Sequence, residues 1–117
     1  MKNLAFPLAA LGLSLAATNV LADDLSDVIG GWVVDSHTCE DYFEERIEIR
    51  MKISQTKISY WETFCDIRRT KRKGNEVDLI LLCSSEGSEW EGREKLRVLE
   101  PDKIYRPEAD TTYRRCE

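Results

Sequence analysis

The sequence predicts a small, mainly β domain, either an antiparallel barrel or a sandwich of about seven strands, stapled by two disulfides. Three observations lead to this prediction. Short runs rich in β-branched and aromatic residues recur along the chain, and polar or glycine-containing turns separate them. One of these runs alternates strictly between apolar and charged residues. The chain also contains 4 cysteines, an even number that is typical of a disulfide framework in a small exported domain.

The first 22 residues have the pattern of a cleavable secretory signal peptide. Lys2 supplies a positive charge, residues 4–17 form an apolar stretch, and Val20-Leu21-Ala22 provides the small residues of a cleavage site. The apolar stretch is shorter than the roughly 20 residues of a membrane-spanning helix. Asp23 rather than Cys follows the predicted cut, so no lipid is expected there. We therefore predict one periplasmic domain over residues 23–117, with no stable membrane anchor.

The first strands are predicted from their residue patterns. One is expected over residues 31–35. The clearest covers residues 46–53, where four apolar residues alternate with four charged ones, as in a strand with one face in water. Ser54-Gln55-Thr56 then turns the chain into a run over residues 57–70 that is rich in Ile, Tyr, Trp, Thr and Phe, residues that pack well on a pleated surface.

Between the first two strands, residues 36–45 do not follow a strand pattern. Thr38 and Asp41 are spaced as the capping pair of a short helix. A single helical turn and an ordered loop are both acceptable for this segment.

The second half of the chain contains the remaining strands. Residues 76–83 are apolar on both parities, so this strand is expected to be buried on both faces. A polar loop is expected over residues 84–88. Further strands are predicted over residues 90–99, 103–105 and 111–116. The connections are short, so neighbouring strands should pair antiparallel.

The cysteine pairing can be argued from a hairpin. If the strands around residues 72–75 are joined by a three-residue loop centred on Gly74, the numbers of paired residues sum to 148, as those of Cys65 and Cys83 do. This predicts a Cys65–Cys83 disulfide, and Cys39 with Cys116 is the pair that remains. A two-residue loop would shift the register by one and remove the argument.

No pattern in the chain predicts catalysis, and we do not expect an enzyme, a metal or a cofactor. The single histidine, His37, lies near Cys39, but a cysteine in a disulfide supplies no thiolate. The chain has no Cys-x-x-Cys pair for zinc or redox chemistry. Its 22 acidic residues make adjacent carboxylates expected on any solvated face, so they do not indicate a catalytic pair.

The charge balance predicts the sign of a partner's charge. The net charge is −5, which favours cationic partners by long-range steering and disfavours nucleic acid. A basic run over residues 68–73 interrupts the acidic background. We expect it to keep a hairpin turn soluble and to make the neighbouring strand edge unattractive for pairing.

Some short motifs carry a resemblance to known proteins. Gly30-Gly31-Trp32 near the start, with Arg114 and Arg115 near the end, resembles the lipocalin-type signature, in which a Trp on the first strand packs under an Arg from the last. Across residues 30–116, the Gly-x-Trp opening and the four cysteines resemble small uncharacterised bacterial periplasmic proteins. In size, export, acidity and β character the chain is also similar to bacterial lysozyme inhibitors, small disulfide-containing barrels that plug the cleft of a cationic enzyme.

These features predict a non-enzymatic periplasmic binding protein that engages a protein partner, with a cationic lysozyme as the most concrete candidate. The segment expected to enter the partner's cleft comprises Ser84, Ser85, Glu86, Ser88 and Glu89. A small-ligand carrier of lipocalin type and a structural or stress component of the cell envelope are the alternatives. A carrier needs an open interior, whereas five large aromatic residues are available to fill a small barrel: Trp32, Tyr60, Trp61, Phe64 and Trp90.

Overall fold

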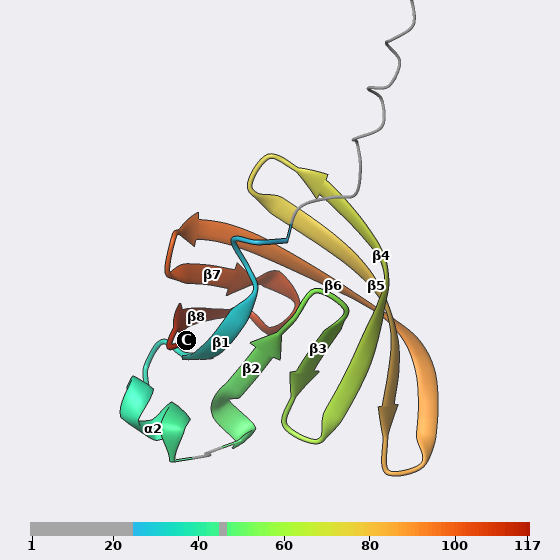
Figure 1. The fold of residues 1–117 in the computed structure, drawn as a ribbon, viewed down its shortest axis with the longest axis horizontal. Helices are drawn as coiled ribbons and strands as arrows, with labels where there is room; N and C mark the ends of the chain where they lie inside the picture. The colour runs from blue at the N-terminus through green and yellow to red at the C-terminus, as the bar shows by residue number, and fades with distance from the viewer. Residues whose placement is uncertain (1–24, 45–46) are drawn as a thin grey trace, which may run out of the picture.

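The computed structural model describes residues 25–44 and 47–117, so the predicted signal peptide lies outside the described residues. The chain forms a closed barrel of eight strands in chain order, each antiparallel to its neighbours, and the last strand pairs with the first (Figure 1). The strands are β1 (Gly30–Val34), β2 (Arg50–Ile53), β3 (Lys57–Tyr60), β4 (Thr63–Lys73), β5 (Glu76–Ser85), β6 (Ser88–Glu100), β7 (Lys103–Arg106) and β8 (Thr111–Arg115). The predicted antiparallel β fold is confirmed, in its barrel form.

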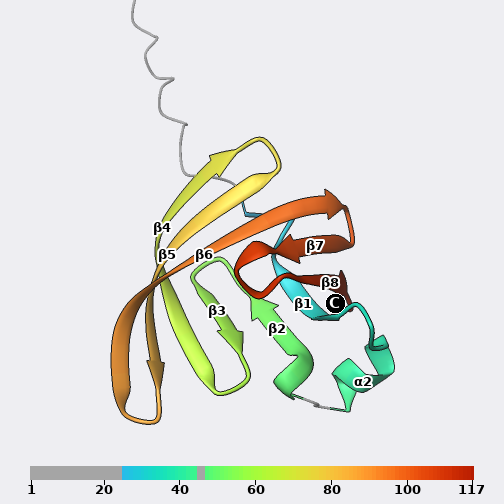
Figure 2. The same cartoon turned by 180° about the vertical axis from the view of Figure 1, so that it is seen from behind.

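Two long hairpins extend the barrel in opposite directions. Figures 1 and 2 show the β4–β5 hairpin projecting at one end and the β5–β6 hairpin at the other. The turn between β3 and β4 lies at the same end as the β5–β6 turn.

Three short helices accompany the strands: α2 (Cys39–Phe43), η2 (Ile47–Ile49) and η3 (Pro107–Ala109). The predicted capping pair is present, because the Asp41 backbone N–H donates to the Thr38 hydroxyl and the Thr38 N–H donates to the Asp41 carboxylate. The helical turn is therefore the correct alternative for this segment. None of the described helices has the length and apolar character that a membrane span requires.

The predicted strand over residues 57–70 is wrong in one respect, because the structure divides it into β3 and β4. The chain reverses at Trp61-Glu62, and Tyr60 pairs with Thr63 across the turn. This division supplies the eighth strand. It keeps the alternation in register, since Ile58 on β3 and its partner Cys65 on β4 are both buried.

The predicted strand over residues 46–53 is also shorter than expected. β2 begins at Arg50, and η2 precedes it. Ile49 is buried against Val33 and Tyr42 in a small second core on the outer side of β1, which α2 covers. The apolar alternation thus begins before the strand does, because Ile49 packs into a different core.

The expectation that residues 76–83 are buried on both faces is wrong. In β5 the buried residues alternate with half-buried ones, so that Val77, Leu79, Leu81 and Cys83 face the interior. The intervening Ile80 and Leu82 face outward and are only half-buried. Unlike β1, β5 has no helix packed on its outer face among the described elements, so these apolar residues stay partly in water.

The barrel interior is packed with large side chains. Trp32, Met51, Ile58, Leu79 and Leu96 are each at most 1% exposed and belong to one core cluster. A barrel of eight strands is just wide enough for its side chains to fill. These buried side chains form one hydrophobic core in the interior.

The contact that the lipocalin-type signature implies is present between Trp32 and Arg115. The Arg115 guanidinium carbon lies 4.4 Å from the centre of the Trp32 ring. Arg115 also donates to the carbonyls of Ile29 at 2.6 Å and Asp27 at 2.8 Å, while the Trp32 indole donates to Val28 at 3.0 Å. The segment before β1 is thereby held across one end of the barrel. Arg114, the other candidate, pairs with Asp35 instead.

Both predicted disulfides, Cys65–Cys83 and Cys39–Cys116, are present. The predicted loop that led to them is wrong, however, because only Gly74 and Asn75 separate Lys73 from its partner Glu76. This turn alone would shift the register by one. A β-bulge between Ile67 and Arg69 inserts one extra residue and restores the register that places Cys65 opposite Cys83.

Asp27 forms a bidentate ion pair with Arg72, whose guanidinium nitrogens donate to its two oxygens at 2.7 and 2.6 Å. The hydrogen bond from Arg72 lowers the pKa of Asp27 below its ordinary value of 3.8. Because the folded-state pKa lies below the unfolded one, the ionised pair stabilises the fold above about pH 4, and this stability is lost as the pH falls through the folded-state pKa.

We expect Asp27→Asn to lower the free energy of unfolding by about 1 kcal/mol or less at neutral pH, since the carboxylate is 41% exposed. The difference should shrink toward pH 2, as the Asp27 carboxyl of the wild type becomes protonated and uncharged like the asparagine. Urea unfolding at the two pH values measures it. A difference that does not change with pH would contradict this account of the ion pair.

Candidate functional site

Three large aromatic side chains that were expected to fill the barrel lie on its surface. Trp61 is 61% exposed, Phe64 62% and Trp90 42%. Of the five aromatic residues considered for the interior, only Trp32 is fully buried, and Tyr60 is half-buried. The five residues that were available to fill a small barrel therefore do not all pack inside. We call the end of the barrel that carries these three residues, together with the β3–β4 and β5–β6 turns, the aromatic end.

Trp61 occupies an unusual backbone conformation. Its φ is +34°, in the left-handed region that a bulky residue rarely adopts. Such a conformation costs of order 1 kcal/mol or more, and it is retained where the surrounding structure demands it, often at functional sites. The turn thus holds a tryptophan out in water at a position where glycine or asparagine would be less strained.

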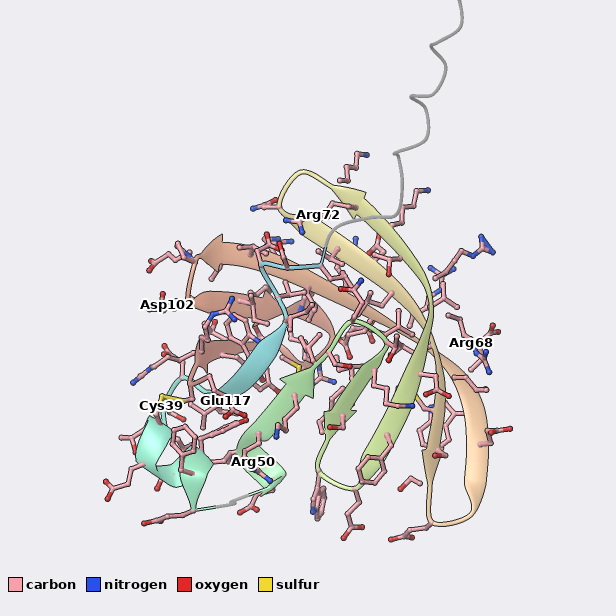
Figure 3. All side chains as sticks on the ribbon, in the orientation of Figure 1. Cys39, Arg50, Arg68, Arg72, Asp102 and Glu117 are labelled. Carbon is pink, nitrogen blue, oxygen red and sulfur yellow. A yellow bond between two sulfur atoms is a disulfide. The ribbon has the colours of Figure 1, made fainter. Side chains whose placement is uncertain are left out.

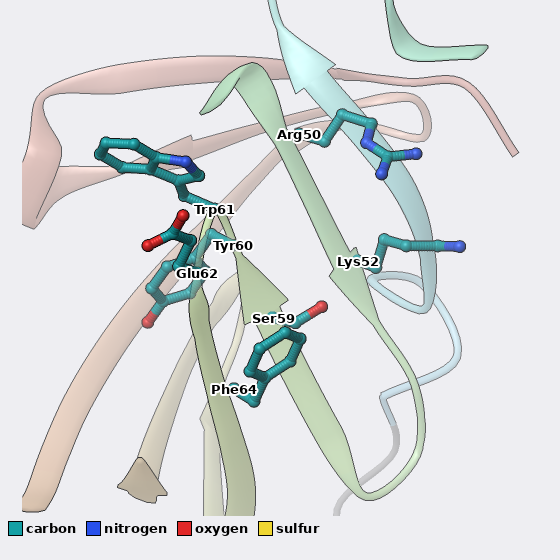
Figure 4. A pocket seen from close by; sticks show the side chains of 7 residues that line it. All are labelled: Arg50, Lys52, Ser59, Tyr60, Trp61, Glu62 and Phe64. Atoms are coloured by element: carbon teal, nitrogen blue, oxygen red, sulfur yellow. The ribbon is translucent and has the colours of Figure 1, made fainter. Parts of the chain in front are cut away.

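A hollow of about 320 Å³ lies beside Trp61 on the outer face of the sheet. Ser59 faces outward on β3, between Lys52 of β2 and Phe64 of β4 in the strand register. Figure 4 shows Ser59 between the Phe64 ring and the Lys52 side chain, with Arg50 beyond Lys52. Because serine is small, the floor of the hollow is low and the aromatic and basic side chains form its walls.

The polar segment predicted to contact a partner is a tight hairpin rather than a loop. Ser84 and Ser85 end β5, whereas Ser88 and Glu89 begin β6. Only Glu86 and Gly87 form the turn, with φ values of +52° and +87°. Two positive φ values are the mark of a type I′ turn, whose twist matches that of the flanking strands.

The structure brings two of those predicted residues next to the exposed aromatic residues. In the register, Phe64 pairs with Ser84 and Ser84 with Glu89. All three line a second hollow of about 340 Å³ that adjoins the first at Ser59 and Phe64. Ser85, Glu86 and Ser88 lie farther along the hairpin toward its turn.

The aromatic end is acidic. Glu62, Glu86, Glu89 and Glu91 are all exposed, and none has an ion pair or hydrogen bond to another side chain within residues 25–44 and 47–117. Several other carboxylates, such as Asp66, which lies 2.7 Å from the Lys57 ammonium, are paired. These four unpaired carboxylates lie on the two hairpins that carry the exposed aromatic residues, whereas the basic side chains of Arg50 and Lys52 line the hollow itself.

A buried polar network anchors this end from inside. The Glu94 carboxylate, 3% exposed, accepts hydrogen bonds from the Arg106 guanidinium at 2.9 Å and from the Tyr60 hydroxyl at 3.0 Å. Arg106 also donates to the Tyr113 hydroxyl at 3.1 Å and stacks over the Tyr60 ring. Burial and the neighbouring carboxylate raise the pKa of Tyr60. Both carboxylate oxygens are engaged, so the network positions Tyr60, the neighbour of Trp61.

The residues considered for catalysis are not assembled into a reactive group. His37 contacts Asp41 at 3.2 Å, and all four cysteines are in disulfides, so no thiolate faces the imidazole. Within the described part of the chain, no three His, Cys, Asp or Glu residues gather as metal ligands. The chemistry that this surface offers is therefore apolar contact and charge.

The basic run occupies the opposite half of β4. The bulge lets both Arg68 and Arg69 face outward, and both are exposed. Figure 3 shows the Arg68 side chain pointing away from the sheet. β3 pairs with β4 only as far as Asp66, so the edge of β4 beyond the bulge carries no neighbouring strand among the described residues. Charged side chains along a free edge disfavour pairing with another chain, and this role of the basic run stays a prediction.

No family model, curated protein or solved structure matches the chain.

Proposed function

We propose that the protein is a non-enzymatic binding protein of the periplasm that engages a cationic protein partner through its aromatic end. The partner is a protein with a cleft that takes up the β5–β6 hairpin and contacts the aromatic residues beside it. A c-type lysozyme is the most concrete candidate, since it is cationic and its cleft accepts a projecting hairpin. The two disulfides fit an oxidising compartment.

The observation that carries this proposal is the exposure of Trp61 and Phe64 beside one hollow. Large aromatic residues are enriched among the few side chains that supply most of the binding energy of protein interfaces. Leaving two of them in water has no benefit for the stability of the isolated barrel. Burial of both rings against a partner would gain the hydrophobic free energy that their exposure to water forgoes.

Charge supports a cationic partner. The unpaired carboxylates of Glu62, Glu86, Glu89 and Glu91 surround the aromatic residues, and such a field raises the association rate of a positively charged protein. The packed interior favours a partner bound on the outside over a ligand carried within.

The test is a calorimetric titration of the oxidised protein against a c-type lysozyme at low and physiological salt, with cell-wall lysis followed in parallel. We expect sub-micromolar binding that persists at physiological salt. The double variant Trp61→Ala/Phe64→Ala should bind at least about 100-fold more weakly, because interface aromatic residues each contribute roughly 2 kcal/mol when they are central.

Leu99→Ala is the matched control. Leu99 is also an exposed apolar residue, 47% exposed, but it lies near the far end of β6. Its loss should leave the affinity unchanged. Equal affinities for the wild type and the Trp61/Phe64 variant, or binding that vanishes at physiological salt, would reject the aromatic end as a specific binding surface.

A further inference from the structure

The first half of β6 has one edge that no strand covers. β6 pairs with β5 along its length from Ser88 to Arg97, whereas β7 pairs with it only from Arg97 onward. Figure 1 shows the lower part of β6 running beyond the rest of the barrel with no strand on its outer side. Residues 88–93 are exposed except Gly92, which is half-buried. An open strand edge is therefore available at the aromatic end.

The direction of the backbone groups on this edge follows from the register. The Val98 N–H donates to the Asn75 carbonyl at 2.8 Å, and the Val98 carbonyl accepts from the Asn75 side chain at 3.2 Å, so both groups point toward the β5 side. The β5–β6 register is continuous, and this direction alternates from residue to residue. The N–H and C=O groups of Glu89, Glu91 and Arg93 consequently point away from β5, toward the open edge.

We propose that this edge accepts an extended segment of the cationic partner as an added β-strand, hydrogen-bonded to the backbone of Glu89, Glu91 and Arg93. The inference rests on the proposed function for the charge of the partner. Strand addition takes its affinity from main-chain hydrogen bonds and its specificity from the side chains on the two faces of the new strand.

The side chains of β6 specify the segment. Glu89 and Glu91 face outward, are exposed and have no ion pair among the described residues, so they match basic residues two positions apart. On the other face, Trp90 stands beside Gly92, where a Cβ would meet only ordinary contacts with Trp90 and Cys83. The space over Gly92 accepts an apolar side chain. The expected pattern is basic, apolar, basic.

A second copy of the chain fits this edge less well. An antiparallel pairing of two β6 edges centred on residue 90 places Glu89 opposite Glu91, and one centred on residue 91 places the two Glu91 side chains opposite each other, although Glu89 then meets Arg93. Centring it on Gly92 pairs Glu91 with Arg93, but it also brings the second copy's Ser88 opposite Leu96. Beyond that point η3 lies against β6 and β7 begins to pair. Charge and space therefore favour a heterologous cationic segment.

Amide hydrogen exchange of the ¹⁵N-labelled oxidised protein tests this directly. The probe is a blocked peptide with alternating lysine and valine, and the control peptide has the same composition with its lysines adjacent. In the free protein, the amides of Trp90 and Gly92 should exchange slowly and those of Glu89, Glu91 and Arg93 rapidly. The alternating peptide should slow the latter three at least about tenfold, and the control peptide should not.

Two results of this experiment would overturn the proposal. One is failure of the alternating peptide to protect the three edge amides, whether it binds elsewhere or not at all. The other is protection that rises with protein concentration when no peptide is present, which would identify a second copy as the occupant.

Glu91→Pro provides an independent test. It removes a donor that faces the open edge and leaves the bonds to β5 intact, and proline is tolerated at such edge positions. We expect at least tenfold weaker peptide binding, against a two- to threefold loss for Glu91→Gln. Slow exchange at Trp90 and Gly92 confirms that the variant is folded.

Should Glu91→Pro fail to fold, Glu89→Lys/Glu91→Lys keeps every backbone N–H and should abolish peptide binding by charge repulsion. Wild-type affinity in any folded variant would contradict strand addition.

The lysozyme titration separates this inference from the proposed function. If lysozyme binds Glu91→Pro as tightly as the wild type but loses affinity for Trp61→Ala/Phe64→Ala, strand addition is wrong and the aromatic end stands. If the peptide protects the edge while lysozyme does not bind, strand addition stands and lysozyme is excluded as the partner.

Discussion

Replacing Cys39 and Cys116 together by alanine should lower the free energy of unfolding by about 4 kcal/mol, the larger of the two disulfide effects. The bridge joins residues 77 apart in sequence, and closing so long a loop removes much conformational entropy from the unfolded chain. It also fixes the start of α2 to the end of the chain, where the Tyr42 hydroxyl donates to Glu117 at 2.6 Å. Urea unfolding followed by circular dichroism measures the change.

The Cys65→Ala/Cys83→Ala variant is the matched comparison. Its bridge spans only 18 residues, and its two cysteines already face each other in adjacent strands, so we expect a loss of about 3 kcal/mol. Because a domain of this size is stable by only about 5 to 15 kcal/mol, either loss is a large share of the total. A smaller loss for the long loop than for the short one would contradict the loop-closure argument.

Glu94→Ala should destabilise the fold as much as the loss of a disulfide, lowering the free energy of unfolding by about 3 to 5 kcal/mol. The substitution leaves the half-buried Arg106 guanidinium without its carboxylate and removes the acceptor of the Tyr60 hydroxyl. A buried charge deprived of its partner keeps its desolvation cost and loses the compensating attraction. Thermal and urea unfolding report the change.

The companion variant Glu94→Leu/Arg106→Leu separates pairing from burial. Replacing both charges by apolar groups of similar volume should restore most of the lost stability, because no unpaired charge then remains. A loss below about 1 kcal/mol for Glu94→Ala, or no recovery in the double variant, would show that the pair does not act as a unit.

The fold class could be predicted because its main signals are local. The even number of cysteines, the alternating run and the short turns each constrain a few neighbouring residues, and together they allow little but a small antiparallel β domain. The capping pair of Thr38 and Asp41 was readable for the same reason.

Other features depend on tertiary context and could not be predicted. The turn at Trp61-Glu62 contains none of the residues that normally mark a turn, so the run from Lys57 to Thr70 resembled one strand. The Cys65–Cys83 pairing was correct although the assumed loop was not, because the bulge after Ile67 compensates for the shorter turn. A bulge leaves no distinct mark in sequence.

The candidate site was only partly predictable. The composition of the polar hairpin predicts it as a contact surface for a partner. Of its residues, Ser84 and Glu89 do lie beside Phe64. The outward position of Phe64 has a sequence signal, since it alternates with Cys65, whose disulfide faces the interior. Large aromatic residues are usually buried, so composition alone favours placing Phe64 inside the barrel. This preference conflicts with the alternation that places it outside.

The most direct test of the account is a spectrum of the three indole N–H groups of the ¹⁵N-labelled protein during titration with unlabelled c-type lysozyme. We predict that the Trp61 and Trp90 signals shift or broaden at physiological salt, while the Trp32 signal, whose N–H donates to Val28 inside the barrel, stays unchanged. A shift of Trp32 alone, or no change in any of the three at concentrations above ten micromolar, would contradict binding of this partner through the aromatic end.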